Sequence, residues 1–127
     1  MVEPNLNAYL QNQIKQAQDM QAQIEQIASQ RYQLDMKVKE LEKTLKELNG
    51  IGKDVPVYKN VGPVIYKIDD KEKLVSDLDE QRELSQMRLK TLENQQKSLE
   101  EKYKELEQAI QKRYEESTRS QNNQGIN

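Results

Sequence analysis

The stretch that decides the fold is Asp54-Val55-Pro56-Val57-Tyr58-Lys59-Asn60-Val61-Gly62-Pro63-Val64-Ile65-Tyr66-Lys67-Ile68. It is rich in β-branched residues and tyrosine and is interrupted by Gly62-Pro63, a pattern typical of a β-hairpin. Turn-forming residues at 60–63 predict that the chain reverses there, so that residues 55–60 pair with residues 64–68. Long charged segments with helical periodicity flank this stretch on both sides. The sequence therefore predicts two helical arms joined by a pair of strands.

Both faces of the predicted hairpin are apolar. One face carries Val55, Val57, Tyr66 and Ile68, and the other carries Tyr58 and Ile65. A single two-stranded hairpin is marginally stable in water, and its open edges can pair with another strand. We therefore expect it to combine with hairpins of other subunits. The alternative, that the hairpin folds onto its own helices, stays open.

The arm before the hairpin has an unbroken heptad repeat. Eleven of its thirteen seam positions are apolar, and no Gly or Pro interrupts it, so a continuous helix over residues 5–49 is expected. At 1.5 Å per residue, such a helix is about 65 Å long. The seam positions are Leu6, Leu10, Gln13, Ala17, Met20, Ile24, Ile27, Arg31, Leu34, Val38, Leu41, Leu45 and Leu48. Asn49-Gly50-Ile51-Gly52 is expected to end the helix through a left-handed glycine.

The arm after the hairpin is predicted to be helical over residues 70–115. Asp69 and Glu72 resemble a capping box at its start. Eight of its twelve seam positions are apolar. These positions are Val75, Leu78, Arg82, Ser85, Leu89, Leu92, Gln96, Leu99, Tyr103, Leu106, Ile110 and Arg113. The heptad repeat of apolar residues does not continue into residues 116–127, which are mostly polar, so a disordered tail is expected.

The hairpin returns the chain to its starting level, so the arms should pack antiparallel. Leu48 should then lie near Val75, and Ser85 should lie level with Val38. The polar seam residues Gln13 and Arg31 also face apolar positions in this register. A parallel homodimer would instead stack Arg31 on Arg31 in the seam, which is costly.

The ends of the arms opposite the hairpin carry a wider apolar strip than two helices can cover. Tyr9 and Ile14 flank the first seam, and Tyr114 flanks the second, close to Tyr9 in the expected register. Exposed apolar surface usually marks a contact site. The helix ends could therefore hold an apolar partner, or their side chains could simply pack locally.

Composition argues against most other functions. The 127 residues allow one domain, with 34% hydrophobic and 33% charged residues and a net charge of −2 that is spread evenly. His and Cys are absent, so we expect no catalytic residue, cofactor or metal site. No basic patch suggests nucleic-acid binding. No apolar run approaches the roughly 18 residues that span a membrane. We expect a soluble, cytoplasmic protein.

The chain resembles the prefoldin β subunit, a chaperone subunit also called GimC β. The resemblance rests on Val57 to Lys67, placed between two heptad helices, and on Arg88-Leu89-Lys90-Thr91-Leu92-Glu93 in the second helix. It covers about residues 6–110. Gly62-Pro63 is also similar to eukaryotic prefoldin subunit 6, a related branch. Residues 1–127 are then a single prefoldin-like domain with helices at 5–49 and 70–115, a hairpin at 54–68 and a tail at 116–127.

This resemblance implies a mainly α fold, with a long antiparallel two-helix coiled coil joined by a β-hairpin that assembles into an oligomeric β-barrel body. It implies a hexamer of two α-type and four β-type subunits. The expected assembly residues are Val55, Val57, Tyr58, Val61, Val64, Ile65, Tyr66 and Ile68.

The resemblance also implies an ATP-independent chaperone that binds unfolded proteins at the coiled-coil tips and transfers them to a group II chaperonin. The expected client-binding residues are Leu6, Tyr9, Leu10, Ile14, Ile110 and Tyr114. The alternative is a structural or scaffolding coiled coil that binds no client. A third possibility, an RNA-binding helical arm, conflicts with the even charge.

Overall fold

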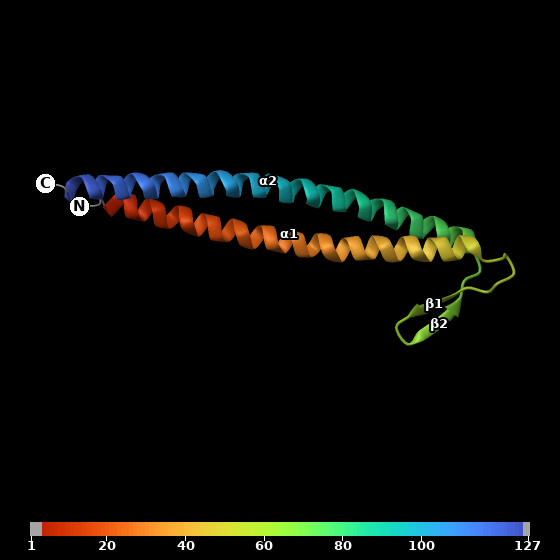
Figure 1. Cartoon of the computed structure of the whole chain (residues 1–127). Coiled ribbons are helices and arrows are strands. Elements are labelled where there is room, and N and C mark those ends of the chain that lie inside the picture. The colour runs from red at the N-terminus through yellow and green to blue at the C-terminus, as the bar shows by residue number, and fades with distance from the viewer. Residues whose placement is uncertain (1–3, 126–127) are drawn as a thin grey trace. The chain divides into compact units, whose positions relative to one another are not determined.

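Two long antiparallel helices joined by a two-stranded hairpin make up the protein (Figure 1). The computed structural model describes residues 4–125, and side chains over residues 7–119. The elements are α1 (Pro4–Gly50), β1 (Tyr58–Val61), β2 (Val64–Lys67) and α2 (Lys71–Gly125). The predicted mainly α fold is confirmed.

Contacts divide the chain into two compact units. The terminal unit comprises the part of α1 up to Gln30 and the part of α2 from Leu92 onward. The hairpin unit comprises Arg31–Thr91, which includes the second half of α1, both strands and the start of α2. Each unit therefore contains a segment of both helices.

Side-chain exposure follows the predicted heptads in both helices. Every predicted seam residue of α1 from Leu10 to Leu48 is buried or half-buried, as is every predicted seam residue of α2 except the exposed Arg113. The side chain of Leu6 lies outside the described residues. The most buried residues are Val38, Leu45, Ser85 and Leu92, each at most 8% exposed. The core is thus a narrow seam between helices, because alternating spacings of three and four place one stripe of each helix inward.

Cross-helix contacts in the hairpin unit agree with the antiparallel register. Val38 and Ser85, expected to lie level, are both buried. Gln86 Nε2 donates a hydrogen bond to Glu42 Oε1 over 3.2 Å. Leu48 and Val75 line the same pocket. These contacts confirm the predicted proximity of the end of α1 to the start of α2.

The hairpin turns at Gly62-Pro63, as predicted. The strands pair antiparallel, with Tyr58 opposite Lys67 and Val61 opposite Val64. Gly62 has φ +55°, and a glycine with positive φ at the first central position is the signature of a type II′ hairpin turn. No other glycine among the described residues has a positive φ. The helix end at Gly50 therefore forms without the left-handed glycine expected there.

The first strand begins later than predicted. Val55 N donates to Gly52 O over 3.2 Å, so residues 52–55 form a turn, and Pro56 has no N–H for a ladder. Strand β1 starts only at Tyr58. One further bond, from Ile68 N to Val57 O at 2.8 Å, extends the pairing beyond the strand.

The start and end of α2 also differ from the prediction. The Lys73 backbone N–H donates to Asp70 Oδ1 over 3.0 Å, so Asp70, rather than Asp69, caps the helix. Helix α2 continues to Gly125, so the prediction of a disordered tail is wrong for residues 116–125. The sequence of that segment has no helix-breaking residue before Gly125. Extending an existing helix is easier than starting one, because each added residue gains a hydrogen bond.

Candidate functional site: the hairpin surface and the tip

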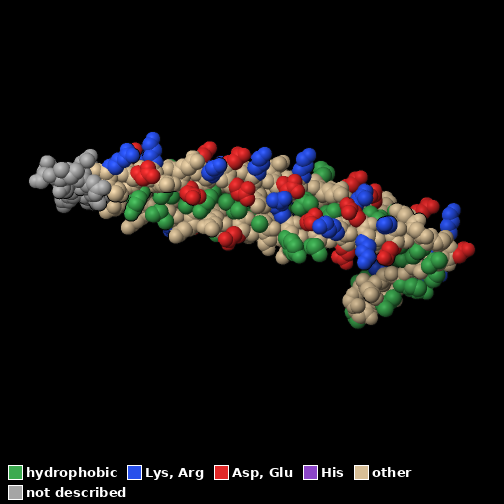
Figure 2. Space-filling model, viewed as in Figure 1, with side chains coloured by type: hydrophobic (Ala, Val, Ile, Leu, Met, Phe, Trp, Pro, Cys, Tyr) green, Lys and Arg blue, Asp and Glu red, His purple; other side chains and the backbone are tan. Residues whose placement is uncertain are grey.

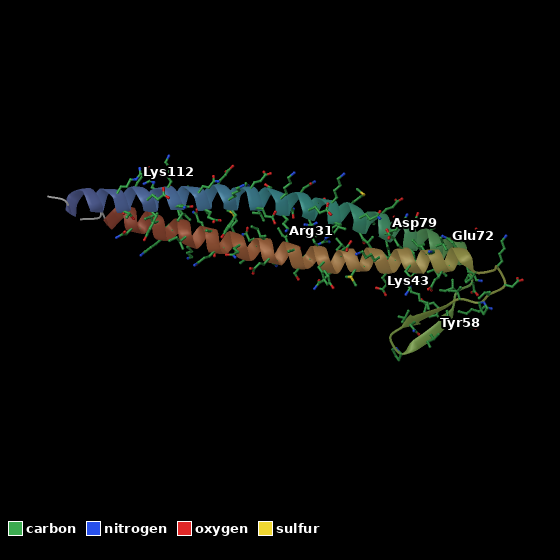
Figure 3. The ribbon with its side chains drawn as sticks, in the orientation of Figure 1. Arg31, Lys43, Tyr58, Glu72, Asp79 and Lys112 are labelled. Carbon is green, nitrogen blue, oxygen red and sulfur yellow. The ribbon has the colours of Figure 1, made fainter. Side chains whose placement is uncertain are left out.

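The apolar side chains of the hairpin are open to solvent. We call the eight residues expected to mediate assembly the hairpin surface. Six of them are exposed: Val55 (45%), Tyr58 (59%), Val61 (49%), Val64 (56%), Ile65 (66%) and Tyr66 (45%). Val57 and Ile68 are half-buried. Tyr58 projects from β1 (Figure 3), and neither strand buries a residue against the helices of its unit.

The strand register assigns the hairpin surface to two faces. Val61 lies opposite Val64, and Tyr66 lies opposite Lys59. Since directly opposed residues share a face and neighbours alternate, Val57 and Ile68 lie on this face too, whereas Ile65 and Tyr58 lie on the other. The register agrees with the predicted faces except at Val55, which is in the preceding turn. Both faces and both outer strand edges are therefore available for contacts.

Lys71 ties the segment before β1 to the start of α2. Its Nζ donates to Lys53 O over 3.0 Å and also to Val55 O. The loop carbonyls beyond the end of α1 thus gain a charged donor, which makes stronger hydrogen bonds than a neutral one. Lys71 positions the segment that leads into the hairpin surface. The sequence alone does not predict this role for Lys71, because only the folded chain brings the loop before β1 close to the start of α2.

An open pocket of about 350 Å³ lies beside this lysine. Leu48, Ile51 and Val75 provide its apolar lining, and its charged residues are Lys53, Lys71 and Glu72. Among the described residues there is no group of three or more His, Cys, Asp or Glu side chains that could hold a metal ion. The pocket offers no assembled set of reactive groups.

The client-binding residues expected from the sequence come together only in part. We call Tyr9, Leu10, Ile14, Ile110 and Tyr114 the tip; all lie in the terminal unit. Tyr9 (45%), Ile14 (44%) and Tyr114 (67%) are exposed, whereas Leu10 and Ile110 are half-buried on the seam. The sixth candidate, Leu6, belongs to α1, but its side chain lies outside the described residues. The exposed side chains of the tip are thus two tyrosines and one isoleucine.

Arg113 is a tip contact that the sequence reasoning missed. Its guanidinium carbon lies 4.7 Å from the centre of the Tyr9 ring, within the range of a cation–π contact. The Tyr9 hydroxyl also accepts a hydrogen bond from Gln13 Nε2 over 3.0 Å. These contacts orient the Tyr9 ring from both helices. The sequence contained one indication of this contact: the last predicted seam position of α2 holds a charged residue, which the end of a two-helix seam cannot bury.

No described helix has a stretch that is long and apolar enough to cross a membrane.

Comparison with known proteins assigns the chain to a family. The family model described as "Prefoldin subunit" matches residues 11–117. The chain is 60% identical over 114 residues to prefoldin subunit beta of Thermoplasma volcanium, covering 90% of this chain and 92% of that protein. The corresponding protein of Thermoplasma acidophilum shows the same identity and coverage.

Solved structures agree with this. The crystal structure of the prefoldin beta subunit from Thermococcus strain KS-1 superposes with a TM-score of 0.73 at 34% identity, covering 88% of this chain and 94% of that one. The beta2 subunit of the same strain shares the fold, with a TM-score of 0.63 at 20% identity. The chain therefore belongs to the prefoldin family of non-enzymatic chaperone subunits, and within it to the β subunits.

Proposed function

We propose that this chain assembles through the hairpin surface into a prefoldin-type hexamer, holds unfolded proteins at the tip without ATP, and passes them to a group II chaperonin in the cytoplasm. One observation carries the proposal: all eight strand residues are exposed, although five of them are valine, isoleucine or tyrosine. A monomer gains no stability from such a hairpin, so a partner that covers it is needed.

The partners we propose for assembly are two α-type subunits, which join four β-type chains. Hairpins from several subunits would then form the β-barrels of a central body, which leaves no strand edge open. Residues 1–127 act in this proposal as a single prefoldin-like domain. Membership among the β subunits supports the choice of α-type partners.

Mass measurement tests this assembly. Light scattering coupled to size exclusion is applied to the chain alone and after mixing with a prefoldin α subunit. We expect the mixture to give one species with the mass of two α and four β chains. A chain that stays monomeric after mixing contradicts the proposal.

The proposed client contact rests on the exposed tyrosines and Ile14 of the tip. Each apolar contact of this size is weak and easily released. Several tips that engage one client raise the overall avidity without slowing release at any single contact. This suits a protein that holds clients only briefly.

The alternative is a scaffolding coiled coil that assembles but binds no client. The buried heptad seam is equally compatible with it, so a functional assay must separate the two. Turbidity of a chemically denatured client, diluted into buffer with and without the complex, does so. Suppressed aggregation supports the chaperone, and unchanged aggregation supports the scaffold.

A further inference from the structure

The two helices of the terminal unit differ sharply in exposed charge. Between residues 7 and 30 of α1, three of eighteen exposed residues are charged, and nine are Asn or Gln. Between residues 93 and 119 of α2, thirteen of twenty-one exposed residues are charged. In Figure 2, red and blue side chains of this unit lie mainly along α2, and tan and green cover most of α1. One side of the unit is therefore almost neutral.

This neutrality is most complete in the two rows that flank the α1 seam. Each row has the heptad spacing of seven residues, and all of its members are exposed and uncharged. The rows are Tyr9, Gln16, Gln23 and Gln30 on one side, and Asn7, Ile14, Gln21 and Ala28 on the other. Flanking positions in coiled coils usually carry charges that form ion pairs between helices. In the hairpin unit the α1 rows do carry charge, at Asp35, Lys37 and Glu42.

The chemistry of these rows fits one kind of partner. A glutamine side chain has two N–H donors and a carbonyl acceptor, the same groups that a peptide bond presents. In a non-native chain many peptide groups are hydrogen-bonded only to water, whereas a native protein has already paired nearly all of its own within the fold. A neutral face also offers nothing to a phosphate backbone, whose binding depends on cations. The charge pattern thus matches an extended, unfolded polypeptide.

We infer that the two neutral rows of α1 form client-binding strips, one on each side of the seam, which take the peptide backbone of unfolded segments through the glutamine amides. The first row begins at Tyr9 and the second includes Ile14, so each strip is continuous with the tip. The inference rests on the proposed function and extends it, because apolar side chains of the client would bind at the tip and its backbone along the rows.

Replacement of three amides tests the inference. The variant Gln16→Ala, Gln23→Ala and Gln30→Ala removes hydrogen-bonding groups from exposed positions and introduces the strongest helix former. The matched control is Asn94→Ala, Gln108→Ala and Gln111→Ala, which removes three exposed amides from α2 of the same unit. Both variants are assembled with a prefoldin α subunit. The probe is fluorescently labelled, reduced and carboxymethylated α-lactalbumin, and its Kd is measured by fluorescence anisotropy.

We expect the α1 variant to raise the Kd about five- to tenfold, since each net hydrogen bond contributes a modest amount and the sites are repeated in the complex. The loss should persist at high salt, because the contacts are neutral. The control should change the Kd less than about twofold. An unchanged Kd for the α1 variant, or an equal loss in both variants, overturns the inference. Absence of probe binding by the unaltered complex contradicts the proposed function itself.

Discussion

At the level of single residues, the hairpin surface depends on side chains that point in opposite directions. Ile65 is 66% exposed, and the register assigns it to the face opposite Val57. Replacing both residues with Asp places a carboxylate on each face. Burying a charge against an apolar partner is costly, so we expect Val57→Asp with Ile65→Asp to prevent hexamer formation while the arms stay helical. Sizing alongside circular dichroism measures both properties.

The control for this variant is Tyr32→Asp with Met36→Asp. These residues are 68% and 49% exposed and lie on α1 rather than on the hairpin. The control should assemble normally. A hexamer that persists in the hairpin variant would refute the role of the hairpin surface.

Lys71 supports a second prediction at this scale. It donates to the carbonyls of Lys53 and Val55, and each hydrogen bond from a charged donor contributes about 1.5–3 kcal/mol. Lys71→Met should therefore loosen the loop and accelerate hydrogen exchange of the Val55 amide at least tenfold. Exchange measured by NMR checks this, with Lys73→Met as the control. Equal exchange rates in the Lys71 variant and the unaltered chain would rule out this positioning role.

At the level of the helices, stability comes from the seam rather than from surface residues. Leu45 is 6% exposed, whereas Leu84 is 60% exposed on the other helix of the hairpin unit. Leu45→Ala should cost about 2–3 kcal/mol through lost burial and a cavity. Leu84→Ala should cost less than about 0.5 kcal/mol. Thermal unfolding followed by circular dichroism compares the two at equal concentration, and equal midpoints would contradict the assigned seam.

Seam and turn positions could be predicted from the sequence because each follows from a local rule. Heptad spacing identified the buried stripe from Leu10 to Ile110, and the Gly62-Pro63 pair identified the turn. Rules of this kind need no knowledge of distant residues.

Element boundaries could not be predicted as well, because competing local interactions decide them. Asp69 and Asp70 are both good caps, and only the structure shows which carboxylate reaches a backbone N–H. Helix α2 extends beyond the end of its apolar heptad repeat. Beyond that point, Thr118 Oγ1 donates a hydrogen bond to the Tyr114 carbonyl over 2.9 Å. The tip contact of Arg113 depends on the other helix, and so no local pattern reveals it.

At the level of the whole molecule, the two surfaces have separate tasks in the proposed function. The hairpin surface joins subunits, and the tip with its neighbouring neutral rows holds clients. Assembly multiplies the number of tips that one client can reach, so weak contacts combine into useful avidity. Because each hydrogen bond of the neutral rows contributes only a modest amount, loss of the tip should abolish capture while the hexamer remains intact.

Client capture at the tip is tested most directly by measuring client aggregation in the presence of a complex whose β subunits lack residues 1–14 and 107–127. This truncation removes every tip residue and leaves the hairpin unchanged. We predict a complex of normal subunit composition that no longer suppresses the light scattering of a denatured client, whereas the full-length complex does. A truncated complex that suppresses aggregation as well as the full-length one would contradict client capture at the tip.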